Sequence, residues 1–174
     1  DRIGSYLVKL SAYDISDSDS KQISKMLQCI GDFERISDHA VNVMEAAREL
    51  HDKKLDLSKE GRHELKTATA AIREILDLAV KSFDEDDLET AYHVEPLEEV
   101  MDNLVEEIRR NHINRLQAGE CTIQQGFVLS DILTNYERVS DHCSNIGVAV
   151  IELANKDSFD AHEYLDRLKT MEDP

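Results

Sequence analysis

Two stretches decide the fold: residues 32–43 read DFERISDHAVNV and residues 135–146 read NYERVSDHCSNI. Glu, Arg, Ser, Asp, His and Asn recur in the same order, at a constant offset of 103 residues, as from Glu34 to Glu137. Flanking apolar positions keep the same offset over more than a full helix turn on either side. A constant offset over this length indicates two copies of one helical unit.

The composition around these copies favours long helices. The 174 residues contain only two prolines and six glycines, and aromatic residues make up 5%. Apolar residues at 41% suffice for a core, and the chain length fits one domain or two small halves that share a core. We therefore expect an all-α fold, an antiparallel helical bundle with the two repeated helices near its centre.

Apolar residues at helical spacing predict six segments. These are 2–14, about 20–50, about 59–83, 96 to about 116, 122 to about 155, and a short helix after 156. The third segment either continues through 87–95 or stops earlier, since Pro96 fits only a kink or a first turn.

Capping signals mark three of the predicted helix starts. Asp19 with Gln22 and Thr122 with Gln125 have the spacing of a capping box, and Ser58 follows a polar linker as an N-cap.

The net charge of −17 is strongly acidic. Such a chain repels nucleic acid phosphates and anionic membrane surfaces, so we expect no nucleic acid partner. Three scattered cysteines without a CxxC pair indicate a reducing compartment. No apolar run spans a bilayer, but the chain begins with Asp1 rather than Met, so we expect a longer protein with room for a membrane segment upstream.

The repeated helix places two carboxylates on one face. Glu34 and Asp38, like Glu137 and Asp141, are four residues apart, which makes them neighbours on a helix. A second acidic stripe follows the helix after Pro96: Glu95, Glu98 or Glu99, Asp102 and Glu106. Solvated acidic faces are common, but an entire polar set retained in duplicate favours a site. Oxygen ligands at this spacing suit Mg, Ca, Mn, Fe or Zn.

The histidines next to the motif aspartates have a different expected role. His39 and His142 point about 100° away from Asp38 and Asp141, so each is expected to bond across the bundle instead of joining its neighbour on one ion. The sequence has no P-loop, GxGxxG, GxSxG or HExxH motif, and we predict that the chain is not an enzyme.

The ERISDHA and ERVSDHC copies resemble the repeated helix of the PhoU family of phosphate-signalling proteins. Three further stretches make the likeness closer to one branch, the cytoplasmic PhoU-like tail of bacterial sodium/phosphate cotransporters: YLVKLS at 6–11, HVEPLEEVMDNL at 93–104 and HINRLQAGEC at 112–121. The resemblance implies a single domain of PhoU-like three-helix repeats. It would consist of a truncated first repeat at 1–57, a complete second repeat at 58–155 and a C-terminal helix at 156–174.

The resemblance also implies a set of metal ligands. They are Glu34, Asp38, Glu137 and Asp141, with Glu98, Glu99 and Asp102 contributing from the hairpin. The implied cofactors are divalent or trivalent metal ions, with iron, zinc or manganese foremost, held as a multinuclear cluster. Because the first repeat lacks its hairpin, the Glu34/Asp38 site is expected to be incomplete.

The function implied is that of a metal-binding regulatory domain of a sodium-dependent phosphate transporter, acting in phosphate uptake and homeostasis. The expected partner is a transmembrane sodium/phosphate transport domain of the same polypeptide, which places this domain on the cytoplasmic side of the membrane; a homodimer is a second candidate. Two alternatives stay open: a helical scaffold for dimerisation or partner docking without metal, and a carboxylate-metal hydrolase or oxidase.

Overall fold

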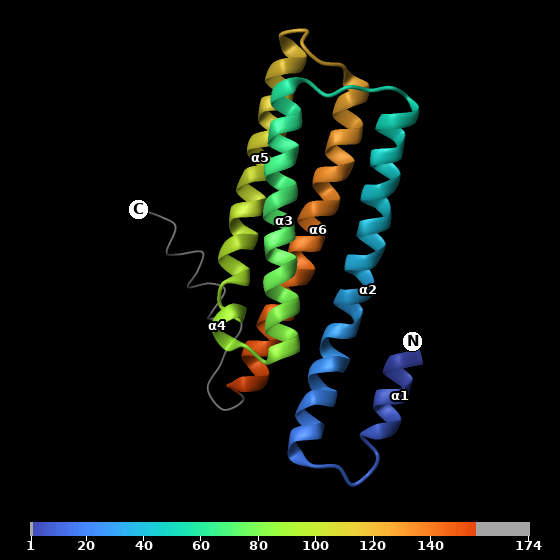
Figure 1. Ribbon diagram of the computed structural model, residues 1–174, viewed down its shortest axis with the longest axis vertical. Helices are drawn as coiled ribbons and strands as arrows, with labels where there is room; N and C mark the ends of the chain where they lie inside the picture. Colours follow the sequence, from blue (N-terminus) through green and yellow to red (C-terminus); the bar gives the residue numbers. More distant parts are fainter. Residues whose placement is uncertain (1, 156–174) are drawn as a thin grey trace.

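The computed structural model describes residues 2–155, and the helix predicted after residue 156 lies outside this range. Long helices that follow one another along the chain run antiparallel, in an elongated bundle (Figure 1). In order they are α1 (Arg2–Leu10), α2 (Asp17–Asp52), α3 (Lys59–Glu85), α4 (Leu88–Ala91), α5 (Val94–Gln117) and α6 (Ile123–Ala154). The all-α prediction is confirmed.

Helix α6, which carries the second copy of the motif, is the centre of the bundle. It packs against α2, α3, α4 and α5, whereas α2 packs mainly against α6 and the short α1 (Figure 1). The expectation of two central motif helices is therefore right for α6 and wrong for α2, which forms an outer edge of the described bundle. No helix within residues 2–155 is both long enough and apolar enough to cross a bilayer.

Two of the three predicted N-caps are correct. Ser58 accepts a hydrogen bond from the Gly61 backbone, and Thr122 with Gln125 forms a complete capping box. The box predicted at Asp19 is wrong, because α2 begins earlier. Its N-cap is Ser16, whose hydroxyl accepts the Asp19 N–H.

The segment between α3 and α5 resolves the alternatives left by the sequence. Asp86 ends α3 in the left-handed conformation, with φ +52°, so the helix does not continue. A single turn, α4, follows, and α5 begins at Val94 with Pro96 in its first turn, where a missing N–H costs nothing.

The two motif helices differ in how well they are covered. Leu129 and Cys143 on α6 are buried, with 1% and 0% exposure, between α2 and the α3–α5 hairpin. Their repeat equivalents on α2, Met26 and Ala40, are exposed, Met26 to 41%. Within residues 2–155 the side of α2 that corresponds to the hairpin-covered side of α6 thus stays open, because the first repeat has only α1 beside it.

A buried lysine connects α2 to the end of α3. Lys25 is 5% exposed; its Nζ donates to the Phe83 carbonyl at 2.6 Å and to Asp86 Oδ1 at 2.5 Å, and lies 4.6 Å from the Phe83 ring centre. The cation also complements the negative end of the α3 dipole. Hydrogen bonds from Lys25 and Gln22 lower the pKa of Asp86 despite some desolvation.

Removing this connection should loosen the base of the bundle. Lys25→Ala is expected to lower the free energy of unfolding by about 2 kcal/mol, less than for a fully buried pair, because Asp86 can rehydrate. Chemical denaturation monitored by circular dichroism measures this change. Lys21→Ala, an exposed lysine one turn earlier, should change it by about 0.5 kcal/mol or less; equal losses in both variants would contradict the assigned role of Lys25.

Candidate functional site

The two motif helices meet through a reciprocal set of polar contacts. His39 Nδ1 lies 2.8 Å from Asn135 Oδ1, and at the equivalent place His142 Nδ1 lies 2.9 Å from Asp32 Oδ1. The two imidazole rings stack with their centres 5.8 Å apart. The prediction that these histidines bond across the bundle is confirmed.

The motif asparagines take part in the same junction. Asn42 and Asn145 donate at 3.0 Å to Asn135 and Asp32, respectively. Asn145 follows Asp141 by about one helical turn, but its amide bonds toward the other motif helix. Each motif helix therefore uses His and Asn to bind its partner and keeps Glu and Asp on another face.

On α6 that other face meets α5 in a row of polar contacts. Ser144 donates to Glu95 at one end of the row. At the other end Arg109 donates to Glu137 and to Thr134. Between these ends lie the carboxylates of Glu98, Asp102 and Asp141.

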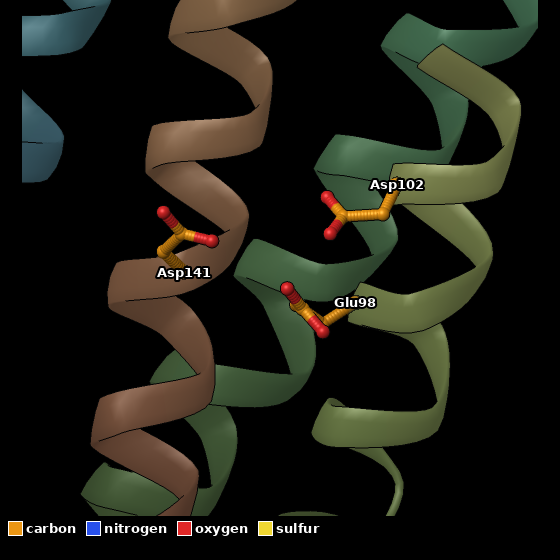
Figure 2. Close-up of side chains that lie close together, drawn as sticks. All are labelled: Glu98, Asp102 and Asp141. Atoms are coloured by element: carbon orange, nitrogen blue, oxygen red, sulfur yellow. The ribbon is translucent and has the colours of Figure 1, made fainter. Parts of the chain in front are cut away.

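These three carboxylates converge in the space between the two helices. Glu98 and Asp102 project from α5 toward Asp141 on α6 (Figure 2), and one oxygen of each lies within 4.8 Å of the others. Glu98 and Asp141 are half-buried, and Asp102 is exposed. Within residues 2–155 this is the group of His, Cys, Asp and Glu side chains close enough to share one ion.

Burial and mutual repulsion disfavour the ionised forms of Glu98 and Asp102. Burial, followed by the charges of Asp102, Glu95, Asp141 and Glu99, raises the pKa of Glu98 to about 8. Burial and the nearby carboxylates of Glu137, Asp141 and Glu99 also raise the pKa of Asp102, whereas the charge of Arg109 lowers it. The site is therefore an electrostatically unfavourable arrangement in the absence of a cation, a feature typical of functional sites.

The remaining predicted ligands lie outside this group. Glu137 is held by Arg109 in a two-point ion pair, with distances of 2.9 and 2.7 Å to its two oxygens. Glu99 is half-buried on α5 without joining the three. Glu34 and Asp38 are exposed on the open side of α2, where Glu34 lines a shallow hollow beside Arg2 and Ile3 of α1.

Arg109 is the contact that sequence reasoning missed. It lies eleven residues after Glu98, close to three helical turns, and therefore on the same stripe of α5. The acidic stripe of this helix ends at Glu106, and Arg109 continues it three residues later. Asp32 and Asn135 were also missed as histidine partners. Each lies seven residues before the histidine of its own helix but bonds to the histidine of the other helix, and the sequence has no signal for such a contact except the repeat itself.

Carboxylates that converge in this way fit a hard or borderline cation. Each offers at least one oxygen; burial and neighbouring carboxylates raise the pKa values of Glu98 and Asp102, and Asp141 also pairs with Arg138 at 3.2 Å. Imidazole and thiol groups are absent from the group, so its donor set consists of oxygen alone. A bound ion would be held by Glu98, Asp102 and Asp141 and would supply the missing positive charge.

The fold and this site define a class: an α-helical bundle built from a repeated helix that bears carboxylates. The family model of the PhoU domain matches residues 1–47 and 65–150, and the chain belongs to this family.

Two individual proteins show the same similarity. The chain is 29% identical over 131 residues to the phosphate-specific transport system accessory protein PhoU homolog 1 of Thermotoga maritima. That alignment covers 75% of this chain but only 56% of the relative's length. The fold is that of the PhoU crystal structure from Pseudomonas aeruginosa, with a TM-score of 0.80 at 23% identity, covering 89% of this chain and 74% of that one.

The raised pKa of Glu98 gives the metal-free protein a defined pH dependence. Between its ordinary pKa of 4.5 and about 8, the folded protein holds a proton on Glu98 that the unfolded chain has released. The folded state therefore binds more protons, and its free energy of unfolding falls as pH rises through this window. Glu98→Gln should match the wild type near pH 5 and be more stable near pH 8, as measured by thermal unfolding in EDTA.

Glu107→Gln is the matched control, since Glu107 is an exposed glutamate on the same helix. It should leave the pH dependence unchanged. If Glu98→Gln had the same thermal stability as the wild type at pH 8 as well as at pH 5, as Glu107→Gln should, Glu98 would not be a destabilising carboxylate.

Proposed function

We propose that this chain is a metal-binding regulatory domain that acts in phosphate uptake, without enzymatic activity of its own. The observation that carries the metal-binding part is the convergence of Glu98, Asp102 and Asp141 within 4.8 Å. Family membership supports the regulatory part, since the Thermotoga maritima relative is named as an accessory protein of phosphate transport. The expected ion is divalent or trivalent, with iron, zinc and manganese foremost.

The proposed partner is a transport domain in the membrane. In the closer resemblance described above, that domain is a sodium-dependent phosphate transporter in the same polypeptide, and the present domain lies on its cytoplasmic side. The open side of α2 supports the idea of a further partner, because apolar and small side chains there are exposed, as Met26 and Ala40 are. A homodimer would use the same surface.

The position of the three carboxylates between two helices supports a regulatory role for the ion. A regulatory site needs an ion to connect two elements, and Glu98 and Asp102 lie on α5 while Asp141 lies on α6. An ion at this position would hold the two helices together and remove the repulsion between them. Ion binding would thus hold the α3–α5 hairpin more rigidly against α6. A transport domain in contact with the hairpin would respond to this change.

Isothermal titration of metal-free protein with Mn²⁺ tests the metal-binding part. The wild type should bind Mn²⁺ and gain thermal stability, by about 2.7 kcal/mol at a hundredfold excess over Kd. Glu98→Gln with Asp141→Asn should lose both effects. A double variant of exposed acidic residues on the same two helices, Glu107→Gln with Asp131→Asn, changes the charge equally and should behave as the wild type.

Failure of the first double variant to lose Mn²⁺ would show that the ion binds elsewhere. An absence of binding by the wild type would favour the scaffold alternative. Uptake of radioactive phosphate by cells that make the complete protein then tests the regulatory part, which requires the Glu98/Asp141 variant and not the control to alter uptake.

A further inference from the structure

A hollow lies between the last turns of α5 and the first turns of α6, and we call it the α5–α6 hollow. Its volume is about 320 Å³. Small-molecule sites in proteins have volumes of roughly 300–1,000 Å³ and mostly apolar walls. Six of the residues that line this hollow are apolar: Ile113, Leu116, Ile123, Phe127, Leu129 and Leu133. In size and in wall chemistry it therefore resembles a binding site for a small molecule.

The polar part of the wall is cationic or neutral. It consists of Arg109, His112 and Ser130, and among residues 2–155 no carboxylate lines the hollow, although the chain has 37 acidic residues. Arg109 uses three of its five N–H groups on Glu137 and Thr134, and the other two have no acceptor within the described chain. Burial lowers the pKa of His112, so its imidazole is neutral at pH 7. The wall thus offers N–H donors and no negative charge.

The first repeat lacks the apolar rim of this hollow. At the offset of 103 residues, Ser20 and Ser24 take the places of Ile123 and Phe127. These two apolar side chains are 64% and 68% exposed, and Ile113 on α5 is 53% exposed. The shared helical unit therefore does not require an apolar rim here, and large apolar side chains gathered in the open are typical of binding surfaces.

Gly126 keeps the hollow open beside His112. A Cβ at this position would lie 2.5 Å from His112 Nε2, so the imidazole would have to move. The repeat equivalent of this glycine is Ile23, so the motif helix itself accepts a large side chain there. Glycine inside a helix is less favourable than alanine, and at this place it leaves room in the wall.

The dimensions favour a small molecule over a protein partner. The lining residues lie within 109–116 of α5 and 123–133 of α6, about two and three helical turns. A stable protein interface buries about 800 Å² on each partner and involves about 20–30 residues a side. The hollow, with ten lining residues, is smaller than such an interface.

We propose that the α5–α6 hollow binds a small aromatic acid, with its ring between Ile113 and Phe127 and its acidic group toward Arg109. The ring buries apolar surface against the rim and stacks on Phe127. The acidic group accepts charge-assisted hydrogen bonds from the two N–H groups of Arg109 that have no acceptor. This site is separate from the group of Glu98, Asp102 and Asp141, so the inference does not depend on a bound ion.

Fluorescence titration with anilinonaphthalenesulfonate in EDTA tests the inference. Phenylnaphthylamine is the matched probe, because it has the same aromatic body without the sulfonate. The wild type should bind the sulfonate saturably and about tenfold more tightly than the neutral probe, since a hydrogen bond to a charged group contributes more than one to a neutral group.

Two double variants show whether the probe binds in the hollow. Ile123→Ser with Phe127→Ser gives the rim the residues of the first repeat and should weaken sulfonate binding about tenfold or more. Val80→Ser with Val100→Ser, the matched control, removes two apolar side chains that are 48% and 52% exposed elsewhere, and should bind as the wild type does. Gly126→Ala, which narrows the hollow, should also weaken binding, with helix content by circular dichroism unchanged in all three.

Arg109→Gln with Glu137→Gln tests the acidic group of the ligand. This pair of changes keeps the local net charge and removes the guanidinium. The affinity for the sulfonate should fall to that for the neutral probe, and the affinity for the neutral probe should stay as in the wild type.

An absence of saturable binding by the wild type would overturn the inference, as would equal binding by the wild type and the Ile123/Phe127 variant. Equal wild-type affinities for the two probes, or a preference for the sulfonate that survives the loss of Arg109, would overturn the assignment of an acid as the ligand.

Discussion

The contact between the two histidine-bearing faces of α2 and α6 is the constraint on which the site depends. His39 with Asn135 and His142 with Asp32 fix the rotation of each motif helix about its own axis. Because an aspartate precedes each histidine, about 100° away on the helix, a histidine that faces the partner helix turns its aspartate to the side. The junction therefore directs the carboxylates toward the flank of each helix, where a third helix can reach them.

Within the described chain only α6 is flanked by a helix that adds carboxylates, because the short α1 beside Glu34 on α2 has none. On its flank, α5 supplies Glu98 and Asp102 to meet Asp141, and Arg109 to meet Glu137. Burial and the neighbouring carboxylates raise the pKa values of Glu98 and Asp102, so the folded protein is less stable at neutral pH than it would be with neutral side chains there. Such a loss of stability is typical of functional sites, and a bound cation would remove it.

The sequence predicted the helices and the role of the histidines because both follow from local spacing. The repeat offset identified the motif helices, and the hydrophobic period gave the other segments to within a few residues. Spacing alone could not choose between Glu98 and Glu99, because the rotation of α5 about its own axis decides which of the two faces Asp141 on α6. The pairing of Arg109 with Glu137 depends on the same rotation, and the start of α2 depends on a competition between two polar residues, Ser16 and Asp19, for one N-cap.

The two copies of the motif thus have the same sequence pattern and different surroundings, and the ion that we propose belongs to the second copy. A crystal of the protein grown with Mn²⁺, with diffraction measured at the manganese absorption edge, tests this assignment most directly. An anomalous peak within bonding distance of Glu98, Asp102 and Asp141 is the predicted result. A peak at Glu34 and Asp38 on α2, with none between α5 and α6, would contradict it.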